Sequence, residues 1–213
     1  MPRTPSIRPD LTLEHAHARP GALVCGIDEV GRGPWAGPVV AAAVILDLSA
    51  VPEGIDDSKR LSARRREALL DQLVASARLG LGVASVAEID AINILQASFL
   101  AMRRAVTAIG VIPSYALVDG AHVPPGLPCP AQAVVGGDAR VLSIAAASVV
   151  AKVTRDRIMV ALAQQFPGYA WEKNMGYGTQ AHRDGLDRLG VTQHHRKSFA
   201  PIRKMLYRIT CNV

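Results

Sequence analysis

Two short apolar runs near the start of the chain constrain its fold more than any other feature. The first extends from Ala22 to Asp28 and the second from Val39 to Leu46. The segment between them carries several turn-forming residues, namely Gly31, Gly33, Pro34, Gly37 and Pro38. This pattern predicts two neighbouring strands joined by a glycine-rich turn. Because parallel strands need a longer crossover, a short connection favours antiparallel pairing and hence a mixed sheet.

Strand and helix patterns alternate along the rest of the chain. Further strands are predicted at Leu81–Val86, Tyr115–Val118 and Gln132–Val135. Helices are predicted at Ser62–Arg78 with Ser62 as N-cap, at Ala87–Ile109 as one helix or a broken pair, at Val141–Phe166 and at Pro201–Arg208. This alternation predicts an α/β fold around one central sheet.

Differences in residue composition divide the chain into three segments. Residues 1–20 have scattered arginines and prolines without an apolar run, and we expect a flexible lead-in there. Residues 21–166 hold the strand and helix patterns and form the predicted core. Glycines, histidines and basic residues then dominate, so 167–213 are predicted to form a small helical C-terminal appendage.

The composition excludes several classes of protein. With 213 residues, 49% of them hydrophobic, the chain can bury a sizeable core and is not expected to be disordered. It has no apolar run of about 18 residues and no secretory signal. Its three cysteines are widely spaced, which indicates neither a disulfide framework nor a zinc site. We therefore expect a cytoplasmic protein without a membrane partner, whose formal charge of +6 is compatible with a polyanionic ligand.

Acidic residues follow the predicted strands at the points where those strands end. Asp28 and Glu29 close the first strand, Asp119 closes a middle strand, and Asp138 follows the next. Carboxylates that converge at one edge of a sheet repel one another unless cations neutralise them. Oxygen-only ligands suit Mg²⁺ or Mn²⁺. Two such ions about 3.5–4 Å apart support phosphodiester cleavage.

The same acids have a simpler interpretation as turn formers, because Asp and Gly are common turn residues. For Asp119-Gly120 and Gly137-Asp138 this interpretation is favoured, and for Asp28-Glu29 the two are evenly balanced. Adjacent residues of a strand also point to opposite faces. Asp28 and Glu29 can therefore share a site only if the chain bends at Val30-Gly31.

Several short stretches together resemble the bacterial ribonuclease HII family, over about residues 22–200. They occur in the order of that family: GIDEVGRG at 26–33, GPVV at 37–40, DSKRL at 57–61, VDG at 118–120, GD at 137–138, SIAAAS at 143–148, AKVTRD at 151–156 and GYGT at 176–179. The resemblance implies an RNase H-like fold, with a mixed five-stranded sheet flanked by helices.

The resemblance also implies an activity and residues that carry it. The expected enzyme cuts the RNA strand of RNA–DNA hybrids, and nicks 5′ of single ribonucleotides in duplex DNA, with two Mg²⁺ or Mn²⁺ ions, leaving 3′-hydroxyl and 5′-phosphate ends. Its metal-binding and catalytic residues would be Asp28, Glu29, Asp119 and Asp138. The turn Gly31-Arg32-Gly33 would hold the junction, and Tyr177 would lie against the sugar. The C-terminal appendage would complete the substrate groove of a monomer.

Other polar residues have less certain roles in the sequence. Lys59 is a candidate phosphate contact, Lys152 and Arg155 are equally well explained as phosphate contacts or as part of a solvated helix face, and Ser148 is either a packing residue or a further contact. Asp156 is expected to pair with Arg155 or Arg157 rather than to act in catalysis. His194 and His195 are expected on the surface or in a loop, His182 as a helix cap, and Trp171 as a hydrophobic anchor.

Two rival functions remain open from the sequence. One is a non-catalytic module that binds hybrids, and the other is a nuclease of the same fold that cuts DNA. The four acids speak against the first, since carboxylates hinder phosphate binding without metal. The Gly31-Arg32-Gly33 turn speaks against the second, which has no need to recognise ribose.

Overall fold

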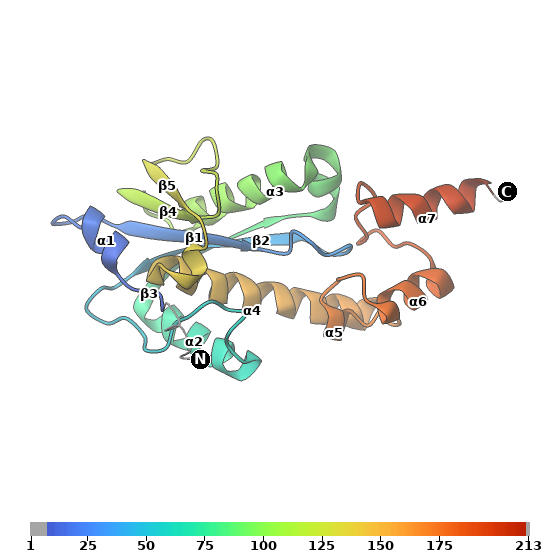
Figure 1. The fold of residues 1–213 in the computed structure, drawn as a ribbon, viewed down its shortest axis with the longest axis horizontal. Coiled ribbons are helices and arrows are strands. Elements are labelled where there is room, and N and C mark those ends of the chain that lie inside the picture. Colours follow the sequence, from blue (N-terminus) through green and yellow to red (C-terminus); the bar gives the residue numbers. More distant parts are fainter. Residues whose placement is uncertain (1–7, 212–213) are drawn as a thin grey trace, which may run out of the picture.

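The computed structural model describes residues 8–211. They form one five-stranded sheet with helices packed around it (Figure 1). Its strands stand in the order β3-β2-β1-β4-β5. Their bounds are Val24–Val30 for β1, Val39–Leu46 for β2, Ala77–Ala84 for β3, Tyr115–Asp119 for β4 and Ala131–Val134 for β5. The pairs β1–β2 and β2–β3 are antiparallel, whereas β1–β4 and β4–β5 are parallel. The predicted mixed five-stranded sheet is confirmed.

Helices cover both faces of this sheet. The helices of the chain are α1 (Thr12–His17), α2 (Ala63–Ser76), α3 (Val86–Ala108), α4 (Leu142–Gln165), α5 (Trp171–Asn174), α6 (Gln180–Leu189) and α7 (Ala200–Cys211), with a 3₁₀ turn η1 at Gly137–Ala139. In Figure 1, α3 lies on one side of the sheet, and α2 and α4 lie on the other. The fold therefore has three layers.

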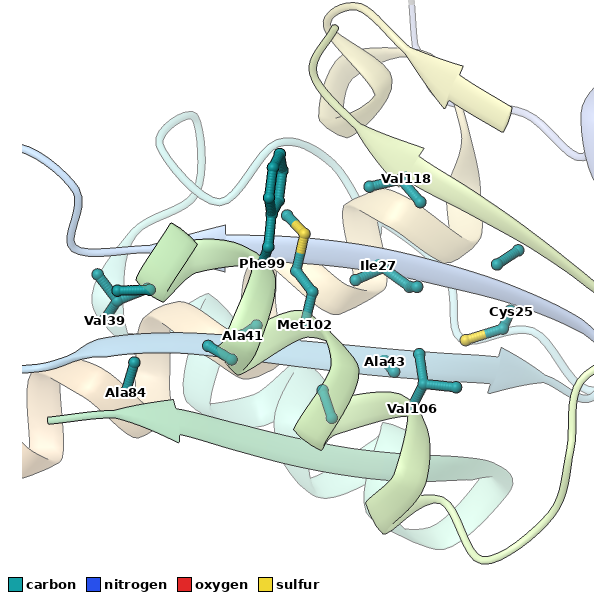
Figure 2. Packing of buried hydrophobic residues seen from close by; sticks show 14 of the residues in the cluster. Cys25, Ile27, Val39, Ala41, Ala43, Ala84, Phe99, Met102, Val106 and Val118 are labelled. Carbon is teal, nitrogen blue, oxygen red and sulfur yellow. The ribbon is translucent and has the colours of Figure 1, made fainter. Parts of the chain in front are cut away.

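Strand β2 is buried along its whole length because both of its faces are covered. On one face Ala41 and Ala43 pack against α3, where Phe99 and Met102 contribute larger side chains (Figure 2). On the other face Val44 packs with residues of α2 and α4. A strand covered on both sides needs apolar residues at every position, which explains the continuous apolar run in the sequence.

Helix α4 begins in direct contact with β1. At Gly26 of β1, an added Cβ would lie 2.1 Å from the backbone carbon of Ser143, closer than any real contact. Only glycine allows this approach. The contact sets the start of α4 against the strand that carries Asp28 and Glu29, and the preceding η1 turn brings Asp138 to the same edge.

The predicted boundary between α2 and β3 is wrong by several residues. The sequence indicated a helix to Arg78 and a strand from Leu81 to Val86, but β3 begins at Ala77 and ends at Ala84. Strand β3 pairs with β2 from Leu46 back to Val39, so tertiary pairing decides its length. Its glycines, Gly80 and Gly82, lie against the α3 backbone and weaken the strand signal.

Helix α1 was not predicted, since its six residues fell within the expected lead-in. Of that lead-in, residues 1–7 lie outside the described residues. In α1, Glu14 is almost fully buried, and its Oε1 accepts a hydrogen bond of 2.7 Å from the amide of Ser143. Helix α4 has no side-chain cap of its own. Glu14 therefore caps α4 from a distant part of the chain.

The remaining helices agree more closely with the sequence. Helix α3 is a broken pair, because Asn93 adopts φ +68° within it and its Oδ1 caps the following turn through the amide of Leu95. The helices α4 and α7 confirm the predictions at Val141–Phe166 and Pro201–Arg208. No helix among residues 8–211 combines the length and apolar character that crossing a membrane requires.

The C-terminal part packs around its own small cluster of apolar residues. Trp171 is fully buried there, as expected for a hydrophobic anchor, and lies with Tyr169, Leu186 and Ile202. Met159 of α4 and Ala36 of the β1–β2 loop belong to the same cluster. Figure 1 shows α5, α6 and α7 at one end of the molecule, beyond the end of β1.

Candidate active site

Two neighbouring parallel strands bring acidic residues to one edge of the sheet. Ile27 of β1 pairs with Val118 of β4, so Asp28 and Asp119, which follow them, lie side by side. Burial raises the pKa of Asp28 well above its ordinary value, and the charges of Glu29, Asp119 and Asp138 raise it further. The four predicted acids therefore lie near one another at this edge of the sheet.

Asp119 also fixes the turn that carries the fourth acid. Its Oδ1 accepts hydrogen bonds from the amides of Gly137 at 2.7 Å and Asp138 at 3.4 Å. Burial raises the pKa of Asp119, and the charge of Asp138 adds to the shift. Oδ1 of Asp119 thus holds η1 in place.

Glu29 is the residue whose environment fits a bound cation best. Its Oε2 is buried without a hydrogen-bond partner among the described residues, while its Oε1 accepts from Nη1 of Arg32 at 3.2 Å. Burial raises the pKa of Glu29, although Arg32 opposes that shift. An unpartnered buried carboxylate oxygen is costly. A cation at this position would satisfy it.

Basic side chains lie against two of these acids. Nζ of Lys59 is 3.0 Å from Oδ2 of Asp138, and Arg32 pairs with Glu29. In this arrangement no three His, Cys, Asp or Glu side chains within residues 8–211 are already grouped as a metal site. The acids are adjacent but their oxygens do not converge on one point, and two of them have cationic partners.

The chain bends directly after these acids, as the expected sharing of one site by Asp28 and Glu29 requires. Strand β1 ends at Val30, and Gly31 adopts φ +97°. An added Cβ at Gly31 would lie 2.2 Å from Nε of Arg155, so glycine is needed both for its conformation and for space. Asp119 raises the pKa values of both Asp28 and Glu29, and the sharing of one site by these two carboxylates stays a prediction.

The glycine turn and the loop of Tyr177 form one unit, although they are far apart in the sequence. The carbonyl of Gly176 accepts hydrogen bonds from the amides of Trp35 at 2.8 Å and Ala36 at 3.3 Å. An added Cβ at Gly33 would lie 3.4 Å from Cε1 of Tyr177, whose side chain is half exposed. The predicted recognition residues of both segments are therefore neighbours.

Of the other predicted contacts, Lys59 and Lys152 have their amino groups bound to acids. Lys59 contacts Asp138, and Nζ of Lys152 lies 2.7 Å from Oδ1 of Asp156. Asp156 thus pairs with Lys152 and not with either candidate arginine. Ser148 is buried, where its hydroxyl accepts from the amide of Ser58 at 3.2 Å and donates to a carbonyl of its own helix.

Arg155 and His195 differ most from the predictions made for them. Arg155 is 1% exposed and bonds main-chain carbonyls, so it is a buried structural residue and does not contact phosphates in this conformation. His195 lies in a loop, one of the two positions expected for it, but it is fully buried there. The cap of α6 is Thr179, and His182, predicted to be that cap, is buried inside the helix. Sequence reasoning overlooked Arg196 entirely.

Comparisons with known proteins agree on one family. The family model described as Ribonuclease HII matches residues 25–202. A Ribonuclease HII of Ruegeria pomeroyi is 59% identical over 94% of this chain and 86% of its own. One from Jannaschia sp. is 60% identical over 93% of this chain and 98% of its own. The crystal structure of ribonuclease H2 from Pyrococcus horikoshii matches with a TM-score of 0.72 and 27% identity, covering 88% of this chain and 99% of that one.

Proposed function

The chain belongs to the ribonuclease HII family and is a ribonuclease H endonuclease, and from this premise we propose that it also nicks duplex DNA on the 5′ side of a single ribonucleotide. The observation that carries the proposal is the contact between three parts. Asp28 and Glu29 of β1 lie beside Asp119 of β4 and lead into the Gly31-Arg32-Gly33 turn, and this turn lies against the Tyr177 loop. This arrangement supports a cutting site with a ribose-reading surface directly beside it.

The four acids are the proposed metal ligands, for Mg²⁺ or Mn²⁺. Their hard oxygen atoms match the preference of these ions, and the unpartnered Oε2 of Glu29 supports a cation in this place. Two bound ions would orient the attacking water and neutralise charge on the leaving oxygen. The cleaved strand would then carry 3′-hydroxyl and 5′-phosphate ends.

The chain itself supplies the positioning. Glycines at 31 and 33 let the backbone approach the sugar closely, and the 2′-hydroxyl is the group that separates RNA from DNA. The half-exposed ring of Tyr177 would lie against the sugar on the DNA side of the junction. Together these contacts would place the scissile phosphate beside Asp28 and Asp119.

Basic residues around the acids are the proposed phosphate contacts. The side chain of Lys59 is 77% exposed, so it is free to move from Asp138 to a phosphate. We assign Lys152 the same role, and Ser148 an indirect one through the amide of Ser58. The C-terminal helices α5 to α7 would complete the groove, and one copy of the chain would suffice for binding a hybrid or a ribonucleotide-containing duplex.

A cleavage assay tests the proposal. The substrate is a DNA duplex with one ribonucleotide, incubated with EDTA, Mg²⁺ or Mn²⁺, and the control is the same duplex without ribose. We expect one nick 5′ of the ribonucleotide with metal and none with EDTA. Binding without cutting in every arm would favour a non-catalytic module, and cutting of the all-DNA control would favour a DNA nuclease.

Single substitutions identify the acids that act. Asp28→Asn and Asp119→Asn are expected to lower cleavage at least about 10³-fold while hybrid binding persists, because removing metal ligands prevents charge neutralisation. Asp47→Asn is the matched control, since Asp47 follows β2 at the opposite end of the sheet. Near-normal turnover by either active-site variant would show that the assignment of metal ligands is wrong.

A further inference from the structure

Two buried arginines lie directly behind the glycine turn. Arg196 is fully buried and Arg155 is 1% exposed. Neither forms a salt bridge with a carboxylate of the described residues, since the ion pairs found there involve other side chains. Burial lowers the pKa of Arg155 to about 10 and that of Arg196 to about 9, so both remain charged at neutral pH. Buried charges of this kind require strong hydrogen bonds.

Arg196 obtains those hydrogen bonds from the turn itself. Its Nη2 donates to the carbonyl of Gly31 at 2.6 Å, and its Nη1 donates to the carbonyl of Arg32 at 3.0 Å. Its Nε donates to the carbonyl of Gly37 at 2.9 Å. The ring of Phe199 lies 5.0 Å from the guanidinium carbon and supports it from behind. One side chain thus binds both ends of the turn.

Arg155 extends the same arrangement to the second recognition loop. Its Nε donates to the carbonyl of Pro38 at 2.9 Å and its Nη2 to that of Ala36 at 3.1 Å. Its Nη1 donates to the carbonyl of Met175 at 2.9 Å, which lies two residues before Tyr177. The two guanidinium groups therefore connect the turn to the Tyr177 loop.

Because the peptide bond is planar, these contacts also fix the direction of the amide groups on the opposite side of the turn. In a trans peptide the C=O and N–H groups point in opposite directions. The carbonyl of Gly31 shares its peptide plane with the amide of Arg32, and the carbonyl of Arg32 shares one with the amide of Gly33. Because Arg196 holds both carbonyls, both amides point away from it. Neither amide donates a hydrogen bond to any of the described residues.

We propose that Arg196 is a positioning residue for ribose recognition, which holds the two carbonyls so that the amides of Arg32 and Gly33 face the substrate. The inference rests on the proposed function, in which this turn reads the 2′-hydroxyl. A planar guanidinium with five donors can bind several carbonyls in fixed directions, whereas a lysine has only a single ammonium centre. Arg155 fixes the flanking peptides in the same way.

The test compares binding with and without ribose. The parent protein carries Asp28→Asn, so that substrate is not cut, and the measured quantity is the ratio of Kd for an all-DNA duplex to Kd for the same duplex with one ribonucleotide. We expect Arg196→Lys to lower this ratio about tenfold, equivalent to about 1.4 kcal/mol. A general loss of folded protein scales both Kd values equally and leaves the ratio unchanged.

Arg104→Lys is the matched control. Arg104 also uses its guanidinium fork, on Glu88 and the carbonyl of Val83, but it lies on α3 outside the site. This variant is expected to keep the parent ratio. If a folded Arg196→Lys variant, verified by circular dichroism, keeps the parent ratio, the role of Arg196 is overturned and the proposed function is unaffected. A parent ratio near one would overturn the proposed function as well.

A second measurement needs no change at position 196. Hydrogen exchange of the Asp28→Asn protein should show that the amides of Arg32 and Gly33 exchange more slowly when the ribonucleotide duplex is bound than when the all-DNA duplex is bound. Equal exchange at both amides with the two duplexes would overturn the inference, even if Arg196→Lys fails to fold.

Discussion

Nζ of Lys59 lies 3.0 Å from Oδ2 of Asp138, so a largely exposed lysine neutralises a largely buried acid of the site. The pair joins two segments that are 79 residues apart in the sequence. A cation that binds Asp138 has to replace this lysine or share the carboxylate with it. Lys59 would therefore compete with the proposed metal ion for Asp138.

Removing Lys59 should change the metal requirement. We expect Lys59→Gln to lower the Mn²⁺ concentration for half-maximal cleavage about threefold, because a partly exposed ion pair contributes up to about 1 kcal/mol. A Mn²⁺ titration of the cleavage rate measures this, with Arg64→Gln on the exposed start of α2 as control. An unchanged or higher requirement would show that Lys59 and metal do not compete.

Glycine 31 and glycine 33 should respond differently to alanine. Gly31→Ala introduces a Cβ at φ +97° against Arg155, and we expect it to lower the free energy of unfolding by about 1–3 kcal/mol. Gly33→Ala meets only Cε1 of Tyr177 at 3.4 Å and should change stability by less than about 1 kcal/mol. Urea unfolding compares the two, and equal losses would contradict the assigned strain.

Tyr177 should matter most where only one ribose is present. We expect Tyr177→Ala to reduce kcat/KM on a single embedded ribonucleotide about tenfold more than on a long hybrid, because a long hybrid offers many registers and a single ribose offers one. Tyr177→Phe keeps the ring and is expected to retain most of the difference between the substrates. If Tyr177→Ala loses both activities equally, the ring has only a packing role.

The buried histidine pair should make stability depend on acid pH. His195 Nδ1 accepts from the amide of Thr192 at 2.9 Å, and its Nε2 lies 3.0 Å from that of His182. Burial, followed by the charge of His182, lowers the pKa of His195 from 6.5 to about 3. As pH falls below 6.5 the unfolded chain binds the proton first, so stability is full above 6.5 and decreases toward pH 3.

Urea unfolding at pH 7 and pH 5 measures this contribution. His195→Gln should be less stable than the natural sequence at pH 7, yet should lose less stability between the two pH values. His122→Gln is the control, because His122 is exposed, and its curves should follow those of the natural sequence. An identical pH response of His195→Gln would contradict a neutral buried histidine.

The sequence alone determined the order of most elements, and it predicted which acids would lie at the edge of the sheet. Strand β2 can be predicted from the sequence because burial on both faces requires an unbroken apolar run. The acids at the ends of β1 and β4 follow from local pattern, and so does the turn at Gly31. These features depend on residues that are near each other in the chain, so the local sequence pattern is enough to predict them.

Tertiary structure decided the features that join distant segments. The extent of β3 depends on pairing with β2, and the cap of α4 comes from Glu14, more than a hundred residues away. A basic residue in a polar segment resembles a surface residue until the fold surrounds it with carbonyl groups, as happens to Arg155 and Arg196. The acids and the glycine turn of the candidate site could be predicted from the local sequence. The direction in which that turn faces depends on long-range hydrogen bonds, which only the tertiary structure shows.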